Sequence, residues 1–256
     1  MSKAVAKKDE PNLPAFADEM FDDSVLGYSE KADDSLIPIL SILQDNSAEV
    51  KKRHEKHIEG AEAGMMIVRS VQQTFDGDEG VLFQPCGFSH TWVEWEGDPG
   101  EGHPVAQYDY DSRPEDAAEV DKPDGGTEWR RDNGNRLVET RNHFGHMLTE
   151  EGHMPMVIAM SGSNHTASRQ WTTLMKQHRT PGGKRAAAFM RVYRITTSFS
   201  QKGQQTWYKY KIQDQGWVED EGLLMDGFNF AKSIAANEVK ADVASDAEGK
   251  DGEVPF

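Results

Sequence analysis

The sequence predicts a mainly β fold, a small β-barrel with one or two helices, a long acidic insertion and disordered termini. Three observations lead to this prediction. Short segments rich in β-branched and aromatic residues recur along the chain, separated by Gly-containing turns. One stretch with helical periodicity stands late among them. A run of acidic residues with repeated Pro and Gly interrupts the middle of the chain.

The sequence of the first part of the chain predicts a flexible arm followed by short strands. Residues 1–35 are polar and weakly patterned, which is typical of an arm outside the folded domain. Leu36–Gln44 is the first apolar segment, and Pro38 favours an extended strand at a sheet edge over a helix. Strand-type sequence then follows in three segments, 65–75, 80–88 and 90–96.

Residues 96–128 predict a solvated insertion. They hold eleven acidic residues against two basic ones, Arg113 and Lys122, and Pro and Gly recur among them. Because such a segment buries little apolar surface, we expect a long acidic loop and not part of the core.

The sequence after the insertion predicts strands around one helix, with a second helix at the end of the folded domain. Strand character resumes at 135–149 and 153–162. A helix is expected to begin at Ser163 or Asn164 and to end near His178. A hairpin over 188–200 and 205–213 follows, and the last amphipathic stretch places four residues on one face: Leu224, Phe228, Ala231 and Ala235. The folded domain therefore spans 36–237, and 238–256 form a disordered acidic tail.

Composition predicts a cytosolic protein. There is no run of about 18 apolar residues and no apolar segment of the secretory type at the N-terminus. The single cysteine, Cys86, cannot form an internal disulfide bond.

The charge distribution predicts an electropositive surface on an acidic protein. The net charge is −16, but the 53 residues from Ser161 to Gln213 contain no Asp or Glu and ten basic side chains. That segment is +10, so the rest of the chain carries −26. An asymmetry of this size is typical of a dedicated surface for a polyanion.

Aromatic residues interleaved with these cations indicate binding of single-stranded nucleic acid, in which bases stack on aromatic rings. Alternation in TWYKYKI puts Trp207, Lys209 and Lys211 on the outward face of a strand. In the preceding strand, Arg191 and Tyr193 share one face and Arg194 lies on the other, so either arginine can be the outward one. The expected DNA-binding set is Arg169, Lys176, Arg179, Lys184, Arg185, Arg191, Tyr193, Arg194, Lys202, Trp207, Lys209 and Lys211.

Motifs for catalysis, cofactors and metals are missing from the sequence, so we expect a protein without enzymatic activity, cofactor or metal. TPGGKR lacks the leading Gly and the hydroxyl residue of a phosphate-binding loop. His143 and His146 would point to opposite faces of a strand, and we interpret them as surface histidines.

The chain ends in an acidic tail that carries apolar residues only at its tip, in the sequence DGEVPF. This ending resembles the C-terminal tip of bacterial single-stranded DNA-binding proteins, which recruits replication and repair enzymes. The resemblance implies a partner-binding role for Asp251, Glu253, Val254, Pro255 and Phe256.

The body of the chain resembles phage-encoded proteins of replication and recombination. The similar segments are GNRLVETRNHF (134–144), VIAMSGSNHTASRQW (157–171), AFMRVYRITT (188–197) and WYKYK (207–211). The resemblance covers roughly Leu36 to Ile212 and implies an OB-fold-like (oligonucleotide/oligosaccharide-binding) β-barrel.

We therefore expect a phage-type single-stranded DNA-binding protein without sequence preference, which protects single strands and recruits replication or recombination proteins through its tail. Two alternatives stay open: a strand-annealing recombination mediator, and an acidic protein that mimics DNA or belongs to the virion. No membrane partner is expected, and a homo-oligomer stays open. If the protein is encoded by a phage, we expect it in the cytoplasm of the infected bacterial host.

Overall fold

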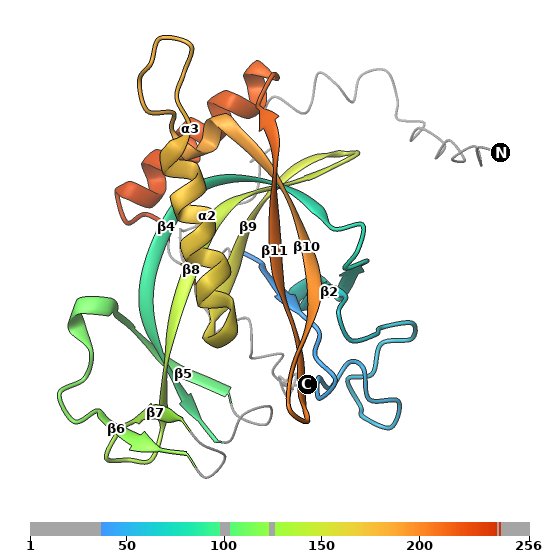
Figure 1. Ribbon diagram of the computed structural model, residues 1–256, viewed down its shortest axis with the longest axis vertical. Helices are drawn as coiled ribbons and strands as arrows, with labels where there is room; N and C mark the ends of the chain where they lie inside the picture. Colours follow the sequence, from blue (N-terminus) through green and yellow to red (C-terminus); the bar gives the residue numbers. More distant parts are fainter. Residues whose placement is uncertain (1–36, 98–102, 123–125, 240, 242–256) are drawn as a thin grey trace, which may run out of the picture. The chain divides into compact units, whose positions relative to one another are not determined.

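The computed structural model describes residues 37–97, 103–122, 126–239 and 241. Within these residues the chain is mainly β, with eleven strands in one sheet and two α-helices packed against it (Figure 1). The sheet curls into a half-barrel, which confirms the predicted fold class and is consistent with an OB-like barrel. None of the described helices has the length and apolar character needed to span a bilayer.

The strands, in chain order, are β1 (Ile39–Ile42), β2 (Met66–Val68), β3 (Gln73–Phe75), β4 (Val81–Glu96), β5 (His103–Asp109), β6 (Ala118–Asp121), β7 (Thr127–Arg130), β8 (Arg136–Thr149), β9 (Gly152–Ser161), β10 (Arg191–Lys202) and β11 (Gln205–Trp217). The α-helices are α2 (His165–Gln177) and α3 (Glu221–Ala235). Single 3₁₀ turns occur at η2 (Arg69–Val71), η3 (Tyr110–Ser112), η4 (Gly162–Asn164) and η5 (Ala188–Met190).

The main path of the sheet runs β11-β10-β4-β8-β9-β1-β2-β3. β1 pairs in parallel with β9 and antiparallel with β2, so the edge position expected for this segment is wrong. Pro38 lies just before the strand, where its missing N–H interrupts no ladder bond. Its carbonyl accepts a hydrogen bond of 2.9 Å from the backbone N–H of Val157.

Side chains connect the edge strand β11 to the region of β1. The Gln44 amide donates to the carbonyl of Tyr208 at 2.9 Å and accepts from the N–H of Tyr208 at 2.8 Å. The Tyr210 hydroxyl donates to the Leu40 carbonyl at 2.8 Å. These side chains therefore join β11 to the region of β1 across the curl of the sheet, and part of the edge of β11 is protected from other strands.

The inner face of the sheet is the face that carries the largest core cluster, and α2 packs on it. Trp171 of α2 is 1% exposed and packs with Phe83 and Tyr193, both fully buried. Its ring makes edge contacts with theirs at centroid distances of 5.8 and 5.6 Å. Burying such side chains stabilises the fold by about 1.5–3 kcal/mol each, so α2 is firmly anchored.

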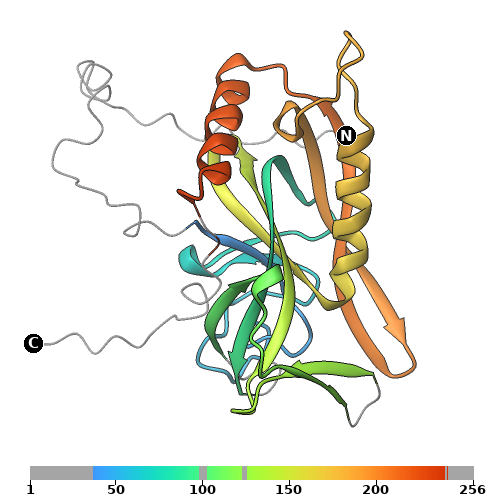
Figure 2. The same cartoon turned by 90° about the vertical axis from the view of Figure 1, so that its left-hand side faces the viewer.

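The outer face carries α3, on the opposite side of the sheet from α2 (Figure 2). Asp220 caps the helix by accepting a hydrogen bond from the Leu223 N–H at 2.7 Å. Gln84 of β4 donates to the carbonyls of Phe189 and Leu223. Gly227 allows this approach, because a Cβ there would lie 2.4 Å from the Gln84 amide nitrogen.

The described part of the mid-chain insertion is structured, although its sequence predicts a solvated loop. It contributes β5, β6 and β7, which extend the far ends of β4 and β8. We call this part, residues 103–122 and 126–135, the acidic lobe. It is fixed to the sheet by Glu94, which is 3% exposed and accepts hydrogen bonds from Tyr108, Arg131, Asn133 and Asn135. A polar interaction between distant residues therefore orders a segment that lacks an apolar core of its own.

Candidate nucleic-acid interface

The β10–β11 hairpin places most of its basic residues on one face. In the register, Arg194 lies opposite Gln213, Lys211 opposite Thr196 and Lys209 opposite Ser198. Because side chains alternate along each strand, five of the expected residues share this side. We call it the outer hairpin face; it consists of Arg194, Lys202, Trp207, Lys209 and Lys211.

The charges of this face are available to a ligand. Lys202 and Lys211 are exposed and Lys209 is partly exposed, and among the described residues no carboxylate pairs with any of the three. Arg194 differs, since it donates at 2.8 Å to the backbone carbonyl of Glu79, in the acidic turn that precedes β4. The uncompensated positive charge therefore lies along β11 and towards the tip of the hairpin.

Arg191 and Tyr193 point to the inner side, which settles the choice between the two arginines in favour of Arg194. The Arg191 guanidinium pairs with Asp214 and lies 4.5 Å from the ring centroid of Trp217. Tyr193 is fully buried, and burial raises the pKa of its hydroxyl. A buried ring cannot stack on a base, and the Arg191 guanidinium is paired with Asp214, so neither side chain is available to a strand on the outer hairpin face.

The other five expected cations lie on α2 and the loop that follows it. Arg169 and Lys176 are exposed and lie seven residues apart, on the side of α2 that faces away from the sheet. Arg179, Lys184 and Arg185 are exposed in the loop, where Arg179 and Arg185 form an isolated bridge. Since α2 covers the inner face, these cations and the outer hairpin face lie on two sides of β11.

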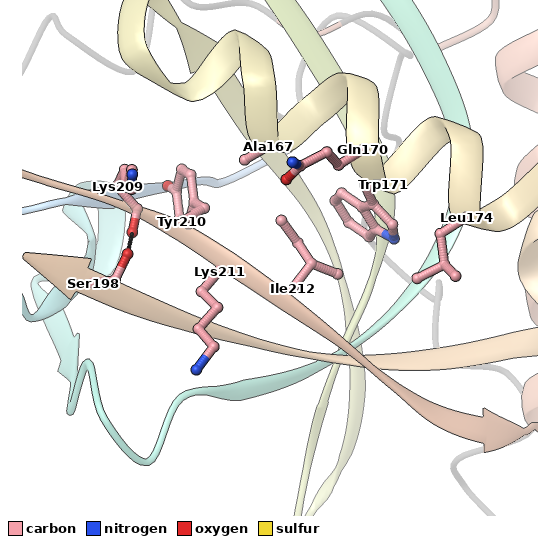
Figure 3. A pocket seen from close by; sticks show the side chains of 9 residues that line it. All are labelled: Ala167, Gln170, Trp171, Leu174, Ser198, Lys209, Tyr210, Lys211 and Ile212. Atoms are coloured by element: carbon pink, nitrogen blue, oxygen red, sulfur yellow. Dashed lines mark hydrogen bonds between the residues drawn. The ribbon is translucent and has the colours of Figure 1, made fainter. Parts of the chain in front are cut away.

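A cavity of about 240 Å³ lies where α2 crosses the edge strand β11 (Figure 3). Its walls are Ala167, Gln170, Trp171 and Leu174 of α2, residues 209–212 of β11, and Ser198 of β10. Lys209 and Lys211 therefore belong both to the cavity wall and to the outer hairpin face. Sequence periodicity places Ala167, Trp171 and Leu174 on one helix face, but no sequence signal brings Gln170 next to β11.

A second aromatic surface, which the sequence did not suggest, runs along β4 towards the acidic lobe. Tyr110 stacks on His90 and Trp92 at centroid distances of 3.7 and 5.6 Å. The Arg113 guanidinium lies 3.6 Å from the ring centroid of Trp129. Alternation in FSHTWVEWE predicts the shared face of His90 and Trp92, whereas the position of Tyr110 depends on the folding of the insertion.

His143 and His146 are buried, although the sequence favours surface positions for both. They lie on opposite faces of β8, as the strand period predicts, with His143 stacked on Trp171 and His146 on Phe230. Burial lowers the pKa of His143 to about 3 and that of His146 to about 4. Both rings are therefore neutral at neutral pH. Among the described residues no cluster of His, Cys, Asp and Glu could hold a metal ion.

The tail tip lies outside the described residues, and so do the expected arm 1–35 and all five expected tail residues, Asp251, Glu253, Val254, Pro255 and Phe256. The start of the tail segment is described in part. Val239 packs against a cluster on the outer face, and Ala241 is 3% exposed within the same cluster.

A protein-family model described as Pam3 phage gp34-like protein matches residues 6–240. No curated protein and no solved structure matches the chain.

Proposed function

We propose that this chain, which belongs to the family of Pam3 phage gp34-like proteins, binds single-stranded DNA without sequence preference and has no catalytic activity. The observation that carries the proposal is the outer hairpin face, where Lys202, Lys209 and Lys211 lie without a carboxylate partner among the described residues. A row of uncompensated cations along a strand suits the regular spacing of backbone phosphates.

The outer hairpin face also has a group that suits a base. Trp207 lies on the same side as Lys209 and is only partly exposed, with its indole nitrogen buried. A partly exposed indole ring next to lysines combines a stacking surface with phosphate contacts. These are the two requirements for binding a single strand. The cations of α2 and its loop would extend the path of the strand around the edge of β11.

The same proposal includes a role in phage replication or recombination. There the acidic tail would recruit partner proteins through Val254, Pro255 and Phe256. This part rests on the resemblance of the tail sequence and on the phage-related family.

The experiment is a titration of labelled oligo-dT with the full-length protein, followed by fluorescence anisotropy over a range of salt concentrations. We expect affinity to fall steeply with salt. The double variant Lys209→Gln, Lys211→Gln should bind more weakly, with a salt slope smaller by about 1.4, from two phosphate contacts at about 0.7 each. The control is Lys122→Gln, Lys232→Gln, which removes the same charge from β6–β7 and α3.

Equal weakening by the two double variants would contradict the assignment to the hairpin, and absence of oligo-dT binding at low salt would contradict the function itself. Duplex DNA of the same length should bind more weakly, because its bases are not free to stack. If the protein makes complementary strands anneal faster than they do without protein, the result would favour the strand-annealing mediator over a protein that only protects single strands.

A further inference from the structure

The cavity between α2 and β11 has the size of a single heterocyclic ring system. Its volume of about 240 Å³ is below the roughly 300–1,000 Å³ of pockets that hold drug-sized ligands. Its wall is apolar at Leu174 and Ile212 and polar at the Gln170 amide, while Lys211 extends from β11 away from α2, at the rim (Figure 3). A flat, polar-edged ring fits such a wall better than a purely apolar ligand.

Trp171 contributes its ring to the cavity wall. Trp171 is 1% exposed, and its indole nitrogen is buried without a hydrogen-bond partner. Figure 3 shows this nitrogen on the side of Leu174, another residue of the wall. Because this nitrogen has almost no accessible surface, a ligand in the cavity would contact the face or edge of the Trp171 ring and not its N–H.

The main chain of β11 offers a hydrogen-bond donor at the cavity. The N–H groups of Tyr208 and Tyr210 point away from β10, since they donate to the side chains of Gln44 and Asn164. The register is regular up to Ile212, so its N–H points to the same side. This strand edge borders the cavity, next to Trp171 and Gln170.

We propose that the cavity takes one base of the bound DNA strand, turned out of its stack, with Lys209 and Lys211 on the adjacent phosphates. This inference rests on the proposed function and deepens it. The edge of β11 offers main-chain donors and the Gln170 amide can both donate and accept, so the wall suits the polar edge of any base, in agreement with binding without sequence preference. The strand would then pass from the outer hairpin face around the edge of β11, with one nucleotide anchored there.

The test uses the full-length protein and a set of dT oligonucleotides, each with a single abasic residue at a different position. We expect about a tenfold loss of affinity when the abasic residue occupies the anchored position, and smaller losses elsewhere. Gln170→Phe places a phenyl ring at the mouth of the cavity from an exposed position. In this variant the intact oligonucleotide should bind more weakly, and the abasic position should no longer matter.

The matched control is Thr173→Phe, which adds the same ring to an exposed position of α2 outside the cavity wall. It should keep the wild-type dependence on abasic position. Equal losses at all positions in the wild-type protein, with intact oligo-dT still bound, would overturn the base pocket and leave the proposed function in place. No binding of intact oligo-dT would overturn both.

A separate titration with dTMP distinguishes a base of the strand from a free nucleotide. Binding of dTMP that is tighter than that of oligo-dT, and is lost in Gln170→Phe, would assign the cavity to a free nucleotide instead. Weak or undetectable dTMP binding, together with the abasic effect, supports the anchored base.

Discussion

The outer hairpin face and the acidic lobe use their basic residues differently. In the lobe, Arg131 pairs with Glu94 and Asp116, and Arg130 pairs with Glu128. On the hairpin, the lysines have no such partner among the described residues. Cations paired inside the protein hold its parts together, whereas cations left in solvent on a rigid strand remain available to a polyanion. The comparison predicts that changes in the lobe alter stability and changes on the hairpin alter binding.

The largest effect is expected from Glu94→Gln, which removes the charge that orders the acidic lobe. Its carboxylate accepts hydrogen bonds from four side chains while 3% exposed. Because hydrogen bonds to charged groups contribute more than neutral ones, the free energy of unfolding should fall by about 3 kcal/mol. Urea unfolding measures this change.

Glu128→Gln is the matched control, since it breaks only the more exposed pair with Arg130 and should cost less than about 1 kcal/mol. Oligo-dT affinity should be unchanged in both variants at temperatures where they remain folded. A clear loss of affinity in folded Glu94→Gln would contradict the separation of the two regions.

Trp207→Ala tests the other side of the comparison. Loss of a stacking ring should weaken oligo-dT binding by about 2 kcal/mol, measured by anisotropy at fixed salt. Trp129→Ala removes the same type of ring from the lobe, where it lies against Arg113, and should lower stability without changing affinity. If the two variants weaken binding equally, Trp207 has no special role in stacking.

The smallest effect near neutral pH is a loss of stability on acidification. Burial lowers the pKa of His143 to about 3, so between about pH 6.5 and pH 3 the unfolded chain binds a proton that the folded chain does not. The free energy of unfolding should therefore decrease as the pH falls through this range. Constant stability between about pH 7 and pH 5 in urea unfolding would argue against neutral, buried histidines.

Glu94 makes the free energy of unfolding depend on pH in a second, more acidic range. Burial by itself would raise the pKa of Glu94, but the hydrogen bonds from Tyr108, Arg131, Asn135 and Asn133 outweigh it and lower the pKa to about 2. Its contribution is complete above the ordinary carboxyl pKa of about 4.5 and is lost as the pH falls through about 2. Glu94→Gln should lose this part of the pH dependence and keep the part due to the histidines.

Local patterns in the sequence were sufficient for most of the fold. The expected strands 135–149 and 153–162 match β8 and β9 within a residue, and the expected helix matches α2. The alternation of side chains between the two faces of a strand also predicted that Trp207, Lys209 and Lys211 share one face. These features depend only on side-chain alternation and on turn and cap residues near in sequence, so they can be read without tertiary contacts.

The order of the acidic insertion was not predictable in this way. Its composition is that of a solvated loop, and no alternation of apolar residues predicts β5, β6 or β7. The order comes from contacts between distant residues: β5 pairs with β4, and Glu94 of β4 accepts hydrogen bonds from donors up to 41 residues away.

The sequence by itself determined the mainly β class, the order of most elements and the presence of a basic, carboxylate-free segment. Tertiary structure alone decided that Arg194 and not Arg191 faces outward, and that Tyr193 and both histidines are buried. It also decided that Gln170 and Lys209 line the same cavity. The physical reason is that alternation fixes which side chains share a face, whereas only the packing of distant elements decides which face is covered. Here α2 covers the inner face, and the charges that face solvent follow from that.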